Sequence, residues 1–403
     1  MTSFVDAVTA RRALEGLIPG ARSDAEVTRA YAAAVWSTLL EPGDGAAGAL
    51  IAQRGVVDAL QWALSAAGPG ADRSGGMPDA QDIDAARRRW LPRRDDVPDA
   101  LAAARRARAR LLTRDDAEWP GQLDDLGVHA PVCLWVRGDA GLLGARAVAA
   151  VVGARASTAY GTHVAMEIAS ACASAGANVV SGAAYGIDAA AHRGALQVGG
   201  PTLAVLAGGV DRPYPAGHDD LITRIASEGA VISEVACGTA PTKWRFLARN
   251  RLIAALGGAT VVVEAAHRSG ALNTAHHAAS LGRPLGAVPG PVTSAASAGC
   301  HRLLREADAV CVTGGGDVLE MLGCAPAVDE PPAHASGRTD ERTRVLDALS
   351  GRRPREAMEV ARRAGMAPDE AAAVLGLLAL EGVVEREGSG WVRRASGPSP
   401  RLW

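Results

Sequence analysis

The sequence is poor in lysine, phenylalanine and asparagine. Among 403 residues it has a single lysine, Lys243, two phenylalanines and three asparagines. Three of these six rare residues lie in one stretch, TKWRFLARNR, which also holds three arginines. Because Ala, Gly and Arg dominate the rest of the chain, we expect this stretch to have a role that needs those particular side chains.

Long apolar runs are also absent. No uninterrupted run reaches the ~18 residues that predict a membrane-spanning helix. The first residues, MTSFVDAVTARRALEG, lack the basic start and apolar stretch of a signal peptide. We therefore expect no membrane association and a cytoplasmic location.

Cysteine spacing excludes the usual metal and redox motifs. None of the six cysteines forms a C-x-x-C pair or the spacing of a zinc site. The sequence therefore predicts buried thiols, with no metal and no cofactor. The six are Cys133, Cys172, Cys237, Cys300, Cys311 and Cys324.

The charge balance is neutral overall but uneven along the chain. Hydrophobic residues make up 48% and charged residues 21%, with a net charge of −2, as in an ordinary soluble protein. The window 240–306 holds eight Lys and Arg residues against two Glu, a local charge of +6. A local basic region of this kind points to an anionic partner that the total charge conceals.

Hydrophobic periodicity divides the chain into segments. Residues 1–112 read as a helical domain, with a basic helix over 87–112 whose arginines form either a solvated face or a nucleic-acid contact. Residues 326–340 are a Pro-rich linker, and 396–403 a tail. Residues 341–395 show three helical patterns, at 341–350, 354–364 and 369–381, followed by a short hairpin, which predicts a winged helix.

Strands and helices alternate in the central segment, 113–325. Nearly all-apolar strands such as AVAAVV, NVVSG and TVVVEA precede helical patterns at 159–175, 185–198, 217–228, 244–256 and 271–281. This alternation predicts an α/β fold, an extended Rossmann-like sheet that is parallel or mixed and covered on both faces.

The first candidate site is the turn after the strand AVAAVV. Gly153 allows a tight turn, and the next helix offers free N–H groups to an anion. Arg155 adds a fork of donors for a phosphate, and Ser157 a hydroxyl. A purely structural βα turn is the alternative, because every doubly wound sheet has such turns.

Two further turns should lie beside the first, because parallel strands present their carboxyl ends at one edge. One begins with Ser181 and Gly182, and the other, Ser269 and Gly270, leads to Thr274. Asp188 follows the earlier turn and reads as a residue that stabilises the start of a helix. His192 comes four residues later, without a third ligand or a nucleophile.

The segment Lys243–Arg251 combines four cations with Trp244, Phe246 and Asn250. Proteins that bind single strands need cations to follow phosphates and flat side chains to stack on bases. An exposed amphipathic helix is the alternative interpretation.

These blocks together resemble the DNA-processing protein A family (DprA, also called Smf), in an actinobacterial-like form. The matching stretches are VVGARASTAYG, SGAAYGIDAAAHRGAL, AVLAGGVDRPYPAGH, ISEVACGTAPTKWRFLARNRLIAAL, VVVEAAHRSGALNT and AVPGPVTSAASAGCHRLL, in order over about 118–315. The flanking segments agree, with a helical (SAM-like) domain before the sheet and a winged-helix-like unit after it.

The resemblance implies a homodimer that binds single-stranded DNA without sequence preference, protects it and loads RecA in transformation or recombination. It implies no catalytic residue. The family's basic pocket corresponds here to Arg155, Lys243, Phe246, Arg249, Asn250 and Arg251, with Gly153, Ser157, Ser181, Gly182, Ser269, Gly270 and Thr274 nearby. Two departures are Ala154, where the family has serine, and Leu247, where it has proline.

The sequence lacks the features that three other functions require. A phosphoribohydrolase would need a Pro-Gly-Gly-x-Gly-Thr-x-x-x-Glu signature, which is absent, and Glu264 has no evident acid–base partner. A dinucleotide-binding module would need G-x-G-x-x-G after the first strand, and Gly153 and Gly161 do not meet it. A transcription regulator would need a basic third helix in the C-terminal unit, where PDEAAAVLGLLALEG is acidic and apolar.

The linker generates the first prediction. We expect a truncated chain ending at Ala325 to bind single-stranded DNA as tightly as the full chain, because Pro-rich linkers separate independent units. Affinities measured at matched ionic strength test this. Arg393 and Arg394 of the hairpin are the cations of the C-terminal unit that would contact DNA, and a loss beyond about tenfold, or ~1.4 kcal/mol, would place that unit in the DNA site.

Overall fold

The protein is described from a computed structural model covering residues 6–20, 22–65, 80–145, 147–324, 341–351 and 353–394. It forms two compact units, residues 1–327 and 328–403, which are described separately. The expected linker and tail lie outside the described residues, and so does most of the Gly-Pro-Asp-rich connector that the sequence predicts at 68–82. No described helix is long and apolar enough to cross a membrane.

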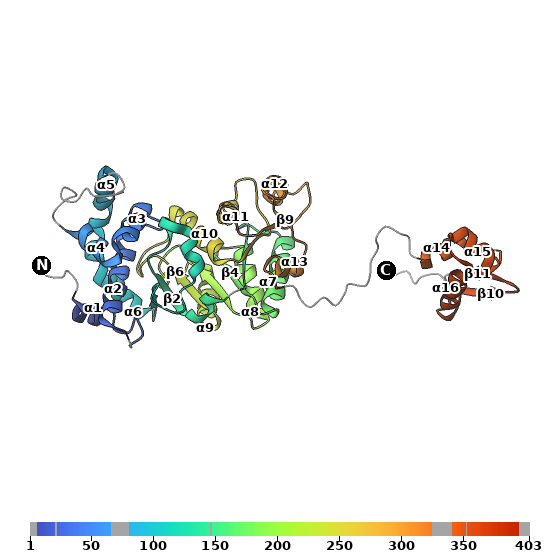
Figure 1. Ribbon diagram of the computed structural model, residues 1–403, viewed down its shortest axis with the longest axis horizontal. Helices are drawn as coiled ribbons and strands as arrows, with labels where there is room; N and C mark the ends of the chain where they lie inside the picture. Colours follow the sequence, from blue (N-terminus) through green and yellow to red (C-terminus); the bar gives the residue numbers. More distant parts are fainter. Residues whose placement is uncertain are drawn as a thin grey trace. The chain divides into compact units, whose positions relative to one another are not determined.

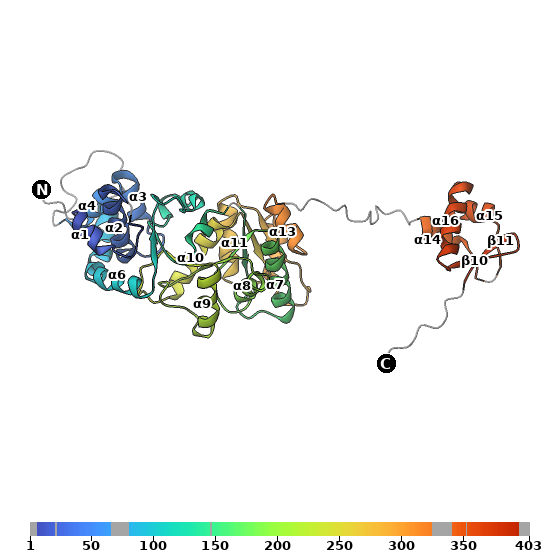
Figure 2. The ribbon, with the colours of Figure 1, turned by 90° about the horizontal axis from the view of Figure 1, so that it is seen from below.

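The N-terminal helices form a bundle at one end of the sheet (Figures 1 and 2), near β2 in Figure 1. A capping box starts α2, because Ser23 accepts from the N–H of Glu26 and Glu26 accepts from the N–H of Ser23. The helices are α1 (Ala7–Ala13), α2 (Asp24–Leu39), α3 (Gly45–Arg54), α4 (Val56–Leu64), α5 (Ala80–Trp90) and α6 (Val97–Arg106).

The single basic helix expected over 87–112 is wrong. A 3-10 segment, Leu91–Asp96, separates α5 from α6 and contains Pro92, whose ring opposes a continuous α-helix. The chain then leaves α6 and forms strand β1 (Arg110–Leu112). The helical segment therefore ends before residue 110, and β1 belongs to the sheet.

The sheet has nine strands in the order β1-β2-β6-β5-β4-β3-β7-β8-β9. The seven from β6 to β9 run parallel, while β2 is antiparallel to both β1 and β6. The mixed Rossmann-like fold is thus confirmed. The remaining bounds are β2 (Leu134–Gly138), β3 (Val148–Val152), β4 (Asn178–Ser181), β5 (Thr202–Val205), β6 (Ala230–Ser233), β7 (Ala259–Val262), β8 (Leu285–Ala287) and β9 (Val310–Cys311).

Helices cover both faces of the sheet. Alternate residues of β3 point to opposite cores: Val148, Ala150 and Val152 to one, Ala149 and Val151 to the other. The first core includes α10 (Lys243–Leu256), α11 (Ala271–Ser280) and α12 (Ala298–Glu306). The second includes α7 (Ala159–Ser174), α8 (Ile187–Gln197) and α13 (Gly315–Met321), and α9 (Asp219–Glu228) packs with the N-terminal helices.

The strand order reverses beside β3. From β3 the chain adds β4, β5 and β6 on one side, and then β7, β8 and β9 on the other. In open α/β sheets, ligands bind at the carboxyl ends of the strands where the order reverses in this way. The fold therefore directs attention to the turns that follow β3, β4 and β7.

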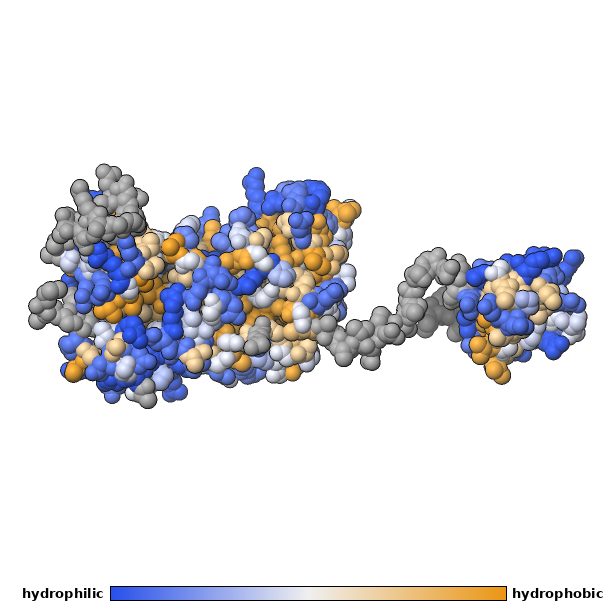
Figure 3. Space-filling model, viewed as in Figure 1, coloured by the Kyte–Doolittle hydropathy of each residue, from blue (hydrophilic) through white to orange (hydrophobic). Residues whose placement is uncertain are grey.

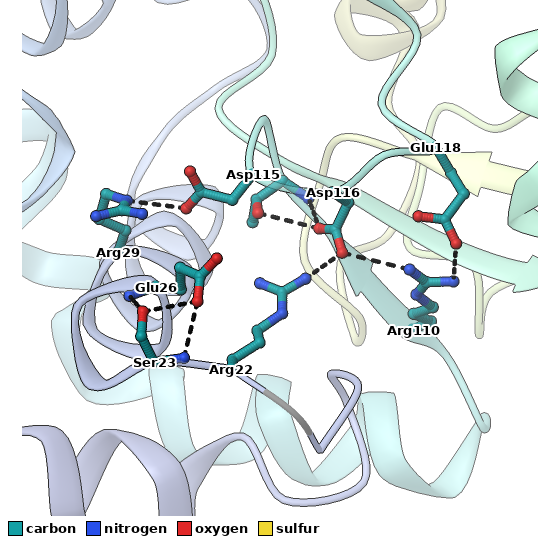
Figure 4. A network of polar contacts seen from close by, with 9 residues as sticks. Arg22, Ser23, Glu26, Arg29, Arg110, Asp115, Asp116 and Glu118 are labelled. Carbon is teal, nitrogen blue, oxygen red and sulfur yellow. Dashed lines mark hydrogen bonds and ion pairs between the residues drawn. The ribbon is translucent and has the colours of Figure 1, made fainter.

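A buried carboxylate connects the bundle to the sheet (Figure 4). Asp116 accepts hydrogen bonds from Arg22, from Arg110 at 3.3 Å, and from the N–H of Thr113 at 2.8 Å. Its side chain is 4% exposed. Burial alone would raise the pKa of Asp116, but the bonds from Arg22 and Thr113 outweigh that effect, so the pKa lies below its ordinary value of 3.8.

The cysteines only partly meet the expectation of buried thiols. Cys133, Cys172, Cys237 and Cys300 are buried. Cys311 is exposed on β9, a short strand at the edge of the sheet, and Cys324, which follows α13, is half-buried.

The C-terminal unit is a winged helix, as predicted. It consists of α14 (Glu341–Ala348), α15 (Ala357–Ala364), α16 (Pro368–Leu380) and the hairpin β10 (Val384–Glu387) and β11 (Gly390–Arg393). Helix α15 starts three residues later than expected, since Arg355 pairs with Trp391 of the hairpin. A hydrophobic patch is visible on this unit (Figure 3). Leu377 and Leu380 of α16 are exposed.

We expect Asp116→Asn to lower the free energy of unfolding by about 3 kcal/mol near neutral pH, because Arg22 and Arg110 would lose their buried carboxylate. A carboxyl group whose pKa is lowered by folding stabilises the folded state at pH values above its unfolded pKa. This stabilisation is lost as the pH falls through the folded pKa. The difference between the variant and the original chain should therefore shrink as the pH falls below the ordinary carboxyl pKa of 3.8.

Denaturant unfolding at several pH values measures both effects. Asp124→Asn is the matched control, since Asp124 pairs with Arg114 at the surface, where such pairs contribute under ~1 kcal/mol. Equal stability losses for the two variants would contradict the role given to Asp116.

Candidate nucleic-acid interface

A cavity of about 1020 Å³ lies at the carboxyl edge of the sheet. It is lined by the turn after β3, the turn after β7 and the first half of α10. Nine of the residues predicted from the sequence line it: Gly153, Arg155, Lys243, Phe246, Arg249, Asn250, Ser269, Gly270 and Thr274. The turns that the sequence placed side by side therefore do meet around one cavity.

A cation and two aromatic rings form one wall of this pocket. The guanidinium of Arg155 lies 4.7 Å from the ring centroid of Phe246, within the range of a cation–π contact. The ring of Tyr214 also packs against the ring of Phe246, with the two ring centroids 5.4 Å apart. Arg155 and Lys243 are both exposed, so their charges are available to a ligand that enters the pocket.

Gly153 allows the β3 turn to approach α8 closely. A Cβ atom at this position would lie 2.5 Å from Cγ1 of Ile187. Any other residue would displace the turn that carries Arg155. The close approach to α8 therefore explains why position 153 is a glycine. It also places Arg155, which the same turn carries, at the pocket.

The floor of the pocket contains a buried charge pair. Arg249 is 4% exposed and donates from one terminal nitrogen to the carbonyl oxygens of Gly182, at 2.8 Å, and Val205. Burial lowers the pKa of Arg249 to about 10, against the opposing effect of Asp188. Burial also raises the pKa of Asp188, against the effect of Arg249 and of the N–H groups of Gly182 and Ala184.

Gly182 makes room for this arrangement. A Cβ at that position would lie 2.2 Å from a terminal nitrogen of Arg249. Gly182 therefore leaves room for the guanidinium of Arg249, and its backbone carbonyl oxygen accepts the hydrogen bond.

Asn250 joins α10 to the turn after β7. Its amide nitrogen lies 3.3 Å from both the carbonyl oxygen of Gly270 and the side-chain oxygen of Asn273. Ser269 accepts from the N–H of Ala271, and Thr274 is buried. These contacts hold two walls of the pocket in one geometry.

Three residues expected near the pocket point elsewhere. Ser157 is hydrogen-bonded to the hydroxyl of Thr162 at 2.9 Å, and Ser181, fully buried, donates to the carbonyl oxygen of Val151 at 2.7 Å. Arg251 is 5% exposed and pairs with Glu234 at 2.5 Å.

The position of Arg251 corrects its assignment to the pocket. On a helix, residues 249 and 251 face different directions, and 251 turns toward the bundle, where a Cβ on Gly43 would lie 2.9 Å from its Nε. Burial raises the pKa of Glu234, against the effect of Arg251. Arg251 thus joins α10 to the N-terminal bundle.

Several cations of the +6 window are neutralised by distant acids. Arg245 pairs with Glu41, Arg283 with Asp125, and Arg251 with Glu234. These carboxylates lie outside the window in sequence, so a local sum cannot include them. The positive charge at the pocket comes from Arg155, Lys243, Arg249 and Arg268.

Sequence reasoning gave no site role to Tyr214, Asp188 or Arg268, all of which line the pocket. Tyr214 lies in the block AVLAGGVDRPYPAGH, which was used only to identify the family. A tyrosine in a Pro-rich turn directly after a strand is the sequence signal that could have placed Tyr214 with the other turns at the strand ends.

Glu264 and His192 have structural surroundings. Glu264 accepts from the N–H and the hydroxyl of Thr158, at 2.9 and 2.6 Å, and so fixes the start of α7. His192 is fully buried beside Thr202, and burial lowers its pKa to about 3. Across the described segments, no group of three or more His, Cys, Asp or Glu residues is placed to hold a metal ion.

The fold and the pocket define a Rossmann-like α/β protein with a cationic site at the point where the strand order reverses, followed by a winged helix. The chain belongs to the DNA recombination-mediator protein A family. The family's own model matches residues 110–323, and that of the DprA winged helix domain matches 329–390. It is therefore a member of a DNA-processing family.

Named relatives agree with this placement. The chain is 47% identical to a putative DNA processing protein DprA of Mycobacterium tuberculosis over 313 residues, covering 74% of this chain and 80% of that one. It is 41% identical to DprA of Streptococcus pneumoniae over 201 residues, 50% and 70% of the two chains. The X-ray structure of the S. pneumoniae DprA superposes with a TM-score of 0.57 and 32% identity, covering 72% and 97%.

We expect Arg155→Ala and Lys243→Ala each to weaken binding of single-stranded DNA by about tenfold, or ~1.4 kcal/mol, and the double variant to weaken it further. Both side chains are exposed at one pocket, so each contributes to phosphate neutralisation without supporting the fold. Each lost contact should also reduce the log–log salt slope by roughly 0.7.

Binding isotherms over a salt series, with circular dichroism to check folding, measure these effects. Arg224→Ala is the matched control, because Arg224 is an exposed arginine of α9 that pairs with Glu228 and does not line the pocket. A folded double variant with unchanged affinity would refute the pocket assignment.

Proposed function

We propose that the protein binds single-stranded DNA in this pocket without catalysing a reaction. It would protect the strand and load RecA onto it, as a homodimer in the cytoplasm, in transformation or recombination. The single observation that carries the proposal is the meeting of Arg155, Lys243 and Phe246 at the reversal point of the sheet.

The side chains around the pocket suit unpaired bases. Cations can neutralise successive phosphates, and flat rings offer stacking surfaces that tolerate any base. Of the chain's four tyrosines, three are exposed on the loops and helix starts at this edge: Tyr160, Tyr185 and Tyr214. In a duplex the base faces are occupied by neighbouring base pairs, so this surface favours single strands.

The titratable residues favour binding over catalysis. Among the described residues that line the pocket, Asp188 is the carboxylate, and it accepts from two backbone N–H groups while lying beside Arg249. A general base needs access to the proton that it removes and a suitable pKa. The contacts of Asp188 are instead those of a group that stabilises a helix start and a buried guanidinium.

Membership of a recombination-mediator family supports the RecA part of the proposal. A mediator must hold a strand by its backbone and leave the bases free of sequence-specific contacts, so that a second protein can take over any sequence. A shallow cationic pocket with stacking rings meets that requirement. Stimulation of RecA filament formation on strands covered by a single-strand-binding protein would test this step.

We expect the full chain to bind oligothymidylate and mixed-sequence single strands with similar affinity, and blunt duplex much more weakly. The affinity should fall with salt by roughly 0.7 in log–log slope for each phosphate neutralised. Competition binding between single-stranded and duplex oligonucleotides of equal length measures the preference. Equal affinity for the two forms would overturn the proposed function.

A further inference from the structure

The first turn of α10 presents its side chains in two directions. Lys243, Phe246 and Leu247 line the pocket. Trp244 does not line it and is 62% exposed. Since residues three apart are neighbours on a helix, Trp244 lies beside Leu247 at the rim of the pocket.

The exposure of Trp244 is unusual within this chain. Trp36, Trp90 and Trp135 are among the largest fully buried side chains. In the parts of the chain that the structure describes, no aromatic ring or guanidinium is found packed on the Trp244 indole. A single exposed apolar residue needs no explanation by itself, so the argument depends on what surrounds it.

The helix turn that carries Trp244 is held rigidly. The hydroxyl of Thr242 caps the helix, accepting from the N–H of Arg245. Arg245 donates to both carboxylate oxygens of Glu41, at 2.9 and 2.8 Å, and to the carbonyl oxygen of Ala240 at 2.6 Å. Glu41 also pairs with Arg93 of the N-terminal bundle.

These ion pairs have two consequences. They remove Arg245 from the set of DNA-binding cations, although it stands between Lys243 and Phe246 in the sequence. They also fix the backbone from which Trp244 projects, which reduces the entropy lost when a ligand stacks on the indole.

The chemistry on either side of Trp244 points to a nucleotide base. Lys243, the adjacent residue, supplies a cation for a phosphate, and Leu247 extends the apolar surface. Phe246 is half-buried, with Arg155 over its ring and Tyr214 beside it. One nucleotide bound in the pocket would therefore occupy the Phe246 ring. The next base along the strand then reaches an unoccupied indole.

We propose that Trp244 stacks on the base next to the nucleotide held in the pocket, so that the bound strand leaves the pocket over the first turn of α10. This inference rests on the proposed binding of single-stranded DNA. Tyr160 marks the other possible exit, but its hydroxyl is tied to the carbonyl oxygen of Pro289, its ring is 44% exposed, and no cation adjoins it in sequence.

The first test compares strand lengths. For oligothymidylate of about 12 nucleotides, Trp244→Ala should lower the affinity by about tenfold and Trp244→Phe by much less, because a phenyl ring still stacks. For an oligomer of about 4 nucleotides in which a single thymidine is flanked by abasic nucleotides, the pocket holds the one base and Trp244 has none to stack on, so both variants should bind nearly as the original chain does. Leu380→Ala, which shortens an exposed leucine of the C-terminal unit, is the matched control.

The second test uses the indole as its own reporter. Stacking of a base should quench part of the tryptophan emission when the longer oligomer is added, and Trp244→Phe should abolish that part. Replacing one thymidine by an abasic nucleotide at successive positions should weaken binding most at a single position, and Trp244→Ala should remove that position dependence.

The outcomes separate the inference from the proposed function. If the original chain binds both oligomers but Trp244→Ala changes neither affinity nor quenching, the inference is overturned and the function stands. If Tyr160→Ala selectively weakens binding of the longer oligomer, the strand leaves on the other side and the inference is again wrong. Unchanged DNA affinity with altered self-association of Trp244→Ala would assign the indole to a protein contact instead. Failure of the original chain to bind either oligomer would overturn the proposed function itself.

Discussion

The buried guanidinium of Arg249 is the constraint on which the pocket depends. It brings α10 against the carboxyl ends of β4 and β5 by donating to the carbonyl oxygens of Gly182 and Val205. A charge removed from water is tolerated only when it is hydrogen-bonded and paired. The neighbouring carboxylate of Asp188, and the absence of a side chain at Gly182, follow from that requirement. Once α10 is seated in this way, Phe246 contacts Arg155 and Lys243 lines the same cavity.

The same helix divides its cations between binding and support. Lys243 remains exposed at the pocket, Arg249 supports the floor, and Arg245 and Arg251 form ion pairs with Glu41 and Glu234. Two of these pairs are close to the Glu41–Gly43 loop of the N-terminal bundle, so the bundle helps to hold the helix that lines the pocket. The N-terminal helices and the sheet therefore act as one unit, in spite of their different composition.

Much of the fold could be predicted from the sequence because the signals are local. Apolar runs of period two and helical patterns of period 3.6 gave α7 and α10 within about one residue of their observed bounds. Parallel strands end at one edge, so the meeting of the turns at Gly153 and Gly270 also followed. The pairing of β1 was missed, because strand pairing is a contact between distant segments. The break between α5 and α6 was missed although Pro92 marks it in the sequence. Arg251 was misplaced for a related reason: its partner, Glu234, lies across a turn whose path the sequence does not reveal.

The sequence by itself determined the family, the order of the elements and the residue types at the pocket, because those are written in patterns within a few tens of residues. Only the tertiary structure decided which of the clustered cations are free. Arg245, Arg251 and Arg283 look like phosphate ligands until acids from remote segments neutralise them, and electrostatic pairing depends on distance in space rather than along the chain. The structure likewise separated Phe246, enclosed by Arg155 and Tyr214, from Trp244, which is left exposed, because residues two apart on a helix face directions about 200° apart.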